Sequence, residues 1–277
     1  MAVGLGPLST LHPVPGFELG IASAGIKRPG RKDVVVMRCA EGSRIAGVTT
    51  TNAFCAAPVL VTRERLGGEV RYLLTNTGNV NAGTGADGLA RARRACARLA
   101  ELAGVTENAV LPFSTGVIGE PLPVEKIESA LQAALDDLKA DNWEAAATGI
   151  MTTDTRPKIA SRQLKLCGQL VTLTGIAKGA GMIQPNMATM LSFIATDAQI
   201  SESLLQEMLS SSVASSFNRI TVDSDTSTND ACMLMASGQY GGPEITADSP
   251  LLPELLAQIP PEETIGTVTA DGAYDTR

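Results

Sequence analysis

Residues 178–191 read KGAGMIQPNMATML, a segment with glycines and a proline that leads into an apolar strand predicted over 190–195. The segment contains one cation, Lys178, and ends in the pair Ala188 and Thr189 before that strand. It has no GK[ST] sequence, which excludes a P-loop. From these residues alone, two interpretations stay open. Thr189 is either an ordinary strand threonine, because β-branched residues favour strands, or a hydroxyl nucleophile.

A nucleophilic hydroxyl needs a base, and the chain has a single histidine, His12, near its N-terminus. A Ser-His-Asp triad, a Cys-His pair or a histidine-rich zinc site would have to use it, so such sites are disfavoured. An N-terminal threonine supplies its own base, an α-amine with a pKa of about 7.7–8.0. Thr189 gains such an amine only if the bond after Ala188 is cut. Thr189 can make that cut by attacking the Ala188 carbonyl.

The composition narrows the class of protein. The chain has 277 residues, of which 22 are Lys or Arg and 29 are Asp or Glu, giving a net charge of −7. An acidic chain with 3% aromatic residues is not expected to bind nucleic acid or an anionic membrane. Its five cysteines are widely spaced without a CxxC pair, which predicts free thiols and a cytoplasmic protein. No apolar run is long enough for a membrane span of about 18 residues.

The predicted elements alternate without strict βαβ order, which favours a layered α/β or α+β architecture. Residues 75–88 are predicted to be a Gly/Asn loop, and the proline-rich residues 239–277 to be weakly structured. The other predicted strands are 34–37, 58–62, 70–74, 110–113, 170–174, 219–223 and 232–236, and the predicted helices are 89–102, 124–140, 142–151 and 201–217.

Three further segments have both a functional and a structural interpretation. Gly83–Gly88 fits the GxGxxG pattern of a dinucleotide-binding loop, but the predicted strand ends well before it, so a glycine turn explains it too. Asp223–Asp230 is an oxygen-rich loop suited to Mg²⁺ or Ca²⁺, or a polar turn between strands. Ser114, Thr115 and Gly116 follow a strand and offer a hydroxyl and backbone N–H for an oxyanion hole, or form a simple turn.

Five ordered segments carry a family resemblance. They are TNTGNVNAGTG (75–85), STGVIGEPLP (114–123), MTTDTRPK (151–158), KGAGMIQPNMATML (178–191) and TVDSDTSTND (221–230). With these segments the chain resembles the ornithine acetyltransferase (ArgJ) family of arginine biosynthesis. The resemblance implies the layered αββα sandwich of that family. It also implies transfer of acetyl from N2-acetylornithine to glutamate, with ping-pong kinetics through an acetyl-enzyme.

The resemblance also implies self-cleavage between Ala188 and Thr189. The products would be an α chain, residues 1–188, and a β chain, residues 189–277, assembled as α2β2. Thr189 then becomes the nucleophile. No metal or redox cofactor is implied, and acetyl-CoA is an alternative acetyl donor in some relatives.

The resemblance assigns four other residues to the site. Thr115 and Gly116 match the family's oxyanion-hole pair. Thr152 and Lys178, together with Thr189, match its substrate contacts, with Lys178 paired to the substrate α-carboxylate.

One region departs from the family pattern. Family members continue past the point where this chain ends, and residues 239–277 lack their later site residues, so a C-terminally truncated chain is expected. Two alternatives therefore stay open. One is a dinucleotide-dependent oxidoreductase that uses Gly83–Gly88, and the other is a non-catalytic fragment.

Overall fold

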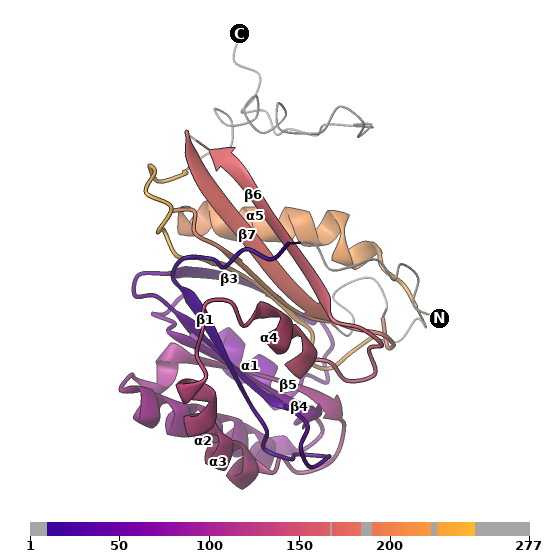
Figure 1. Cartoon of the computed structure of the whole chain (residues 1–277). Helices are drawn as coiled ribbons and strands as arrows, with labels where there is room; N and C mark the ends of the chain where they lie inside the picture. Colours follow the sequence, from indigo (N-terminus) through magenta and orange to yellow (C-terminus); the bar gives the residue numbers. More distant parts are fainter. Residues whose placement is uncertain (1–9, 167, 184–189, 223–225, 247–277) are drawn as a thin grey trace.

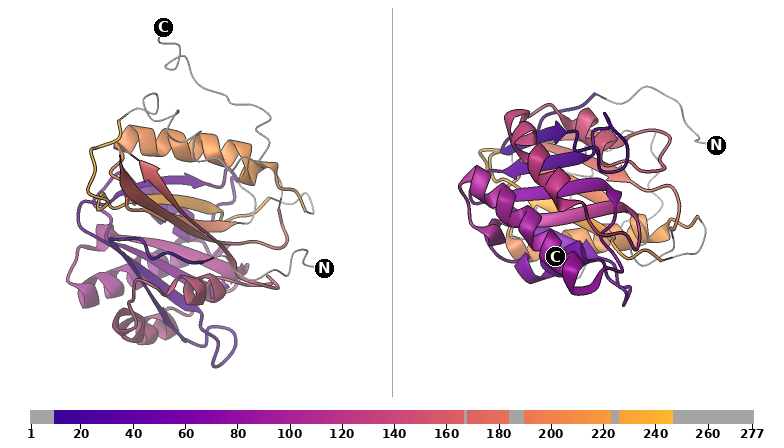
Figure 2. Two further views of the ribbon diagram at one scale, coloured as in Figure 1. Left: turned by 45° about the horizontal axis from the view of Figure 1, so that its top comes forward. Right: turned by 90° about the horizontal axis from the view of Figure 1, so that it is seen from below.

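Two β-sheets pack face to face, and helices cover the outer face of each sheet (Figures 1 and 2). The left view of Figure 2 shows α5 (Glu202–Ser215) above the two sheets and α2 (Gly85–Ala103) with α3 (Val124–Asp136) below them. This order of layers confirms the αββα sandwich predicted from the sequence. The computed structural model describes residues 10–166, 168–183, 190–222 and 226–246.

The four-stranded sheet consists, in spatial order, of β1 (Phe17–Ala22), β2 (Val34–Cys39), β4 (Tyr72–Asn79) and β5 (Val110–Val117). The first two pairs are antiparallel, whereas β4 and β5 are parallel and are connected through α2. The carboxyl ends of β4 and β5 therefore reach the same edge of the sheet, which is where ligands bind in many α/β proteins.

The five-stranded sheet consists, in spatial order, of β3 (Arg44–Thr49), β9 (Ala231–Ala236), β8 (Leu191–Thr196), β7 (Gln169–Lys178) and β6 (Lys158–Leu166). β8 and β9 are parallel, and the other neighbours are antiparallel. The two strands from the C-terminal part of the chain, β8 and β9, thus lie between β3 and β7, which come from the part before residue 188.

Apolar side chains fill the space between the sheets. Phe113 of β5 and Phe193 of β8 meet edge to face, with ring centroids 5.0 Å apart and an interplanar angle of 81°. Trp143, at the start of α4 (Trp143–Gly149), is buried in the same core. Separate apolar clusters hold α2 and α3 to the four-stranded sheet and α5 to the five-stranded sheet.

The strand predicted over 58–62 is wrong, because this segment belongs to helix α1 (Ala57–Arg65). Its β-branched residues favoured a strand, but Pro58 stands in the first turn, where its missing N–H has no consequence. Val61, Thr62 and Arg65 are buried together with the first turn, which is the spacing of a helix face. Packing against β5 and α2 therefore overrides the local strand preference.

Other segments also differ from the sequence-based expectation. β5 and β7 extend beyond the strands predicted at 110–113 and 170–174, and β3 and β6 were not predicted. β4 continues to Asn79 through residues predicted to be a loop, because they pair with β5 in parallel register. Residues 217–219 form a short 3-10 helix, and no strand forms over the described residues 219–222. Tyr240 and Ile245 are buried beneath α5, so this part of 239–277 is packed rather than weakly structured. The remainder, 247–277, lies outside the described residues.

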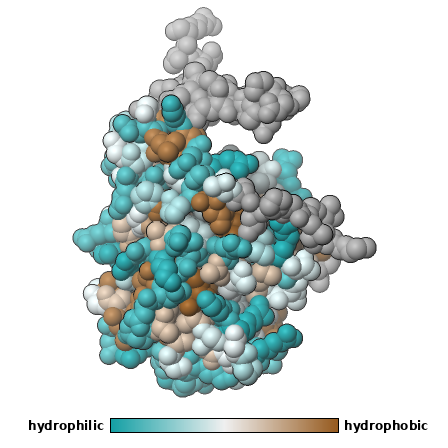
Figure 3. Space-filling model, in the orientation of Figure 1, coloured by the Kyte–Doolittle hydropathy of each residue, from teal (hydrophilic) through white to brown (hydrophobic). Residues whose placement is uncertain are grey.

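Four cysteines are free, as predicted, and Cys167 lies outside the described residues. Burial raises the pKa of the Cys39, Cys96 and Cys232 thiols to about 12, so they remain protonated and unreactive at neutral pH. The face seen in Figure 3 is mostly hydrophilic with separate hydrophobic patches. None of the helices in the described part of the chain combines the length and the apolar character needed to cross a membrane.

The packing of α3 gives a first testable prediction. Leu131 is fully buried against the four-stranded sheet, whereas its neighbour Gln132 is exposed. Leu131→Ala should lower the free energy of unfolding by about 2–5 kcal/mol, because it removes apolar contacts and leaves a cavity. Gln132→Ala, the control, should change it by less than about 0.5 kcal/mol. Urea unfolding followed by circular dichroism measures both, and equal effects would show that α3 does not cover the sheet in this way.

Candidate active site

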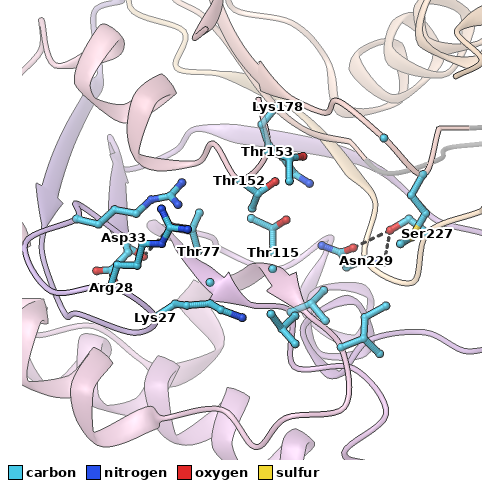
Figure 4. Close-up of a pocket in the computed structure, with 18 residues that line it drawn as sticks. Lys27, Arg28, Asp33, Thr77, Thr115, Thr152, Thr153, Lys178, Ser227 and Asn229 are labelled. Atoms are coloured by element: carbon cyan, nitrogen blue, oxygen red, sulfur yellow. Dashed lines mark hydrogen bonds between the residues drawn. The ribbon is translucent and has the colours of Figure 1, made fainter. Parts of the chain in front are cut away.

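The carboxyl ends of β4 and β5 open into a cavity of about 480 Å³ (Figure 4). Its lining comes from both sheets, from the loop before β2 and from the loop after α4. Thr115, Gly116, Thr152 and Lys178 all line it. The structure therefore brings together four residues that were predicted from distant parts of the sequence.

Gly116 occupies a position that only glycine fits. Its φ of +141° lies in a region that side chains disfavour, and a Cβ there would stand 2.3 Å from the carbonyl carbon of Gly78. The register of β4 also shifts between Gly78 and Asn79, which is a β-bulge. The backbones of the two strands therefore approach closely at the point where they reach the cavity.

Thr115 is buried at 3% exposure and lines the cavity beside Gly116. The carbonyl of the preceding residue, Ser114, accepts a hydrogen bond from the side-chain amide of Asn229, which comes from the other sheet's side of the cavity. The Asn229 carboxamide is oriented in turn by the Ser227 hydroxyl at 2.7 Å. These bonds fix the peptide that connects Ser114 to Thr115, so the oxyanion-hole candidates are held by β5 and by the loop before β9.

Lys178 ends β7 and is almost completely buried, with 2% exposure. Burial disfavours its charged form and lowers its pKa from 10.5 to about 8, although the carboxylates of Asp154 and Asp230 favour the ammonium. At neutral pH the side chain is still largely protonated. It therefore places a buried, poorly solvated positive charge at the cavity, where a carboxylate ligand would be attracted strongly.

Asp154 organises the loop that carries Thr152. One carboxylate oxygen accepts hydrogen bonds from Lys158 and, at 2.8 Å, from the Gly179 N–H, and the other accepts from the Thr152 N–H at 3.3 Å. Burial opposes ionisation of Asp154, but these donors outweigh it and lower its pKa below the usual value. The buried carboxylate thus joins the Thr152 loop to the residue that follows Lys178.

Ala188 and Thr189 lie outside the described residues, so their predicted roles stay predictions. Described residues before them line the cavity, and those after them contact or pair with residues next to it. Gly181 and Met182 line it before the gap. After the gap, the Met190 N–H donates to the Asp230 carboxylate at 2.7 Å, and Leu191 pairs with Lys178.

The structure does not support a dinucleotide site at Gly83–Gly88. β4 ends at Asn79, several residues before the first glycine. The Asn81 amide donates to the Gly88 carbonyl at 2.8 Å, and a Cβ at Gly88 would stand 1.9 Å from the Thr84 hydroxyl. The Gly88 end of the segment is therefore filled by the chain's own side chains, and the first glycine does not follow a strand directly as in a dinucleotide-binding loop.

His12 lies away from the cavity, and the oxygen-rich loop Asp223–Asp230 is described only from residue 226 onward. The backbone of His12 is bound to Ser161 and Thr174 of β6 and β7, and His12 does not line the cavity. Within the described residues no three His, Cys, Asp or Glu side chains gather as a metal site would require. Of the proposed metal loop Asp223–Asp230, residues 223–225 lie outside the described part.

Several residues in or beside the cavity were not predicted from the sequence. Asp154 and Asn229 stand within recognised segments, but nothing in their spacing showed that they connect loops. Lys27, Arg28 and Arg31 belong to the run KRPGRK at 27–32, a basic cluster in an acidic chain, which was the available signal.

The model of the ArgJ family matches residues 18–264. The chain belongs to the ArgJ family. The matched range includes the first part of residues 239–277. The chain is 71% identical over 256 residues to the arginine biosynthesis bifunctional protein ArgJ of Pseudomonas syringae, covering 92% of this chain and 63% of the relative. It is 58% identical over 239 residues to that of Methylococcus capsulatus, covering 86% of this chain and 59% of the relative. It thus spans about three fifths of these relatives.

Solved structures support the family and the fold. ArgJ of Bacillus halodurans matches with a TM-score of 0.55 and 35% identity, over 63% of this chain and 92% of that one. The ornithine acetyltransferase of Mycobacterium tuberculosis, solved with ornithine, matches with a TM-score of 0.55 and 29% identity, over 64% and 94%. An L-aminopeptidase of Ochrobactrum anthropi with a variant Ntn-hydrolase fold shares only the fold, with a TM-score of 0.52 and 14% identity, over 92% and 85%.

The buried ammonium of this ArgJ-family chain predicts a pH dependence of stability. Because the folded-state pKa of Lys178 is about 8 and the unfolded value is 10.5, the unfolded chain binds more protons between these values. Wild type should therefore gain stability relative to Lys178→Met as pH rises from about 8 to 10.5, by up to roughly 3 kcal/mol. Urea unfolding at a series of pH values measures the difference, and parallel profiles would contradict a lowered pKa.

Proposed function

We propose that this chain catalyses acetyl transfer from N2-acetylornithine to glutamate through an acetyl ester of Thr189. The observation that carries the proposal is the cavity that unites Thr115, Gly116, Thr152 and Lys178. Membership of the ArgJ family supports it, and so does the structural similarity to the ornithine acetyltransferase of M. tuberculosis. Because the chain spans about three fifths of its curated relatives, a non-catalytic fragment is the competing outcome.

The first step of the proposal is self-cleavage. The Thr189 hydroxyl attacks the Ala188 carbonyl, the amide becomes an ester, and water hydrolyses the ester. The products are a carboxylate on Ala188 and a free α-amine on Thr189, which serves as the base in later steps. The α chain 1–188 and β chain 189–277 would remain joined, because β8 and β9 are paired on both sides with β7 and β3. An α2β2 assembly is the corresponding quaternary proposal.

The second step is acetyl transfer between two amines. Thr189 attacks the acetyl carbonyl of acetylornithine, and the Thr115 hydroxyl and Gly116 N–H stabilise the oxyanion. Collapse of this intermediate expels the ornithine amine, which takes a proton, and leaves acetyl-Thr189. The glutamate amine then attacks the ester and releases N-acetylglutamate. Lys178 holds the α-carboxylate that both substrates share, and Thr152 contacts the substrate beside it.

This chemistry needs no metal or redox cofactor, because the bond that breaks and the bond that forms are of the same kind. Acetyl-CoA is included as a second donor, since a thioester would acylate the same hydroxyl at the same oxyanion hole. The free thiols favour a reducing compartment, so a cytoplasmic location is part of the proposal.

Thr189→Ala tests the nucleophile directly. The variant should remain a single chain and transfer no acetyl, because both steps need the hydroxyl. Intact mass under denaturing conditions should show two species for wild type, divided between Ala188 and Thr189, and native gel filtration should show them together. A cleaved Thr189→Ala variant would remove Thr189 from this role. An uncut, inactive wild type would support the fragment interpretation.

Thr115→Val tests the oxyanion hole. Loss of one donor should lower kcat for acetyl transfer by about 10²–10³-fold and slow cleavage, because one hole serves both carbonyls. Thr115→Ser keeps the hydroxyl and should retain most of the activity, which separates the chemical role from packing. Release of ornithine from acetylornithine measures the effect, and equal rates for Thr115→Val and wild type would exclude this residue.

A further inference from the structure

The cavity has a strong excess of positive charge. Among the described residues that line it, Lys27, Arg28, Arg31 and Lys178 are cations, and Asp33 is the sole anion. The Asp33 carboxylate accepts hydrogen bonds from the Ala24 N–H at 2.6 Å and the Ile26 N–H at 2.7 Å, so much of its accepting capacity is used within its own loop. A chain with a net charge of −7 thus concentrates cations at one site, which favours an anionic ligand.

The cations differ in how they are held. Lys178 is buried, and the Arg31 guanidinium donates to the Met151 carbonyl, which ties Arg31 to the loop of Thr152. Lys27 and Arg28 are exposed at the cavity, and neither has an ion-pair partner among the described residues. In Figure 4 the Thr115 side chain lies between Lys178, on one side, and Lys27 with Arg28, on the other. The cavity therefore has a buried, fixed ammonium at one end and two exposed cationic side chains, which can change conformation, at the other.

The loop between β1 and β2, which carries Lys27, Arg28 and Arg31 and is called the basic loop, nevertheless has a fixed backbone. A Cβ on Gly78 would stand 3.2 Å from the Lys27 Cβ, so the loop packs directly on the end of β4, where Gly78 meets Gly116 of β5. The Asp33 bonds hold the residues just before Lys27, and the Thr77 N–H donates to the Asp33 carbonyl at 2.9 Å. Lys27 and Arg28 thus extend flexible side chains from a fixed backbone position next to Gly116.

We propose that Lys27 and Arg28 bind the side-chain carboxylate of the acetyl acceptor and select a dicarboxylic amino acid. The inference rests on the proposed function, in which one cavity accepts a donor with a cationic side chain and an acceptor with an anionic one. Both have an α-carboxylate, which the fixed Lys178 holds. Side chains that differ in sign need charges that can turn toward one and away from the other, and the exposed Lys27 and Arg28 meet this requirement.

The test uses Lys27→Gln, Arg28→Gln and the double variant of the full chain. Their KM for glutamate should rise about 10-fold or more, because charge-assisted hydrogen bonds to the carboxylate are lost. Acylation by acetylornithine, measured as ornithine release without acceptor, should change little. The preference for glutamate over the neutral acceptor glutamine should fall by a similar factor. Lys32→Gln is the matched control, because Lys32 belongs to the same exposed run but does not line this cavity.

Calorimetric titration with glutamate and glutamine separates this inference from the proposed function, since binding needs no turnover. A wild-type preference for glutamate that the double variant loses supports the inference even if no acetyl is transferred. Active wild type with unchanged glutamate KM and binding in the double variant overturns the inference and leaves the function standing. Wild type that binds glutamate no better than glutamine also overturns it. A further titration uses coenzyme A, whose phosphates are anionic too; a double variant that loses only coenzyme A binding and keeps its preference for glutamate overturns the inference as well.

Discussion

The close approach of β4 and β5 at Gly78 and Gly116 is the constraint on which the site depends. A side chain at Gly116 would overlap the Gly78 carbonyl carbon, and the bulge at Asn79 ends the regular pairing at the same point. The strands can therefore end side by side with their backbone exposed to the cavity. The basic loop packs against Gly78, and the Asn229 amide anchors Ser114, so both walls of the cavity are built on this contact.

Buried carboxylates around the cavity hold the backbone segments that lead to the site. Asp33 caps the loop before Lys27, Asp154 binds the Gly179 N–H, and Asp230 binds the Met190 N–H. Each thereby fixes a segment that enters or leaves a strand near the site. Asp154 and Asp230 also act on Lys178, because their negative charges favour its ammonium form. The same residues thus contribute to both the rigidity of the site and the charge state of Lys178.

The layers were predicted from local sequence patterns, whereas most of the site residues were predicted only through the family resemblance. Helices with clear apolar periodicity, such as α3, were found with small errors at their ends. α1 was mistaken for a strand because only its packing reveals the helical face. Thr115 and Lys178 were found through the family segments, since neither composition nor spacing distinguishes them from structural residues. Asp154 and Asn229 could not be assigned, because their role is to connect loops that are distant in the sequence.

The topology also explains how a chain cut at residue 188 would keep its structure. Lys178 and Leu191 are direct partners, yet residues 179–190 connect them, far more than the two to five residues of a typical hairpin. The pairing of β7 with β8 therefore does not depend on a short turn. β8 and β9 lie between β3 and β7, so hydrogen bonds on both flanks would hold a separated C-terminal chain in the middle of the sheet. Cleavage after residue 188 would therefore create no new strand edge in the described sheet.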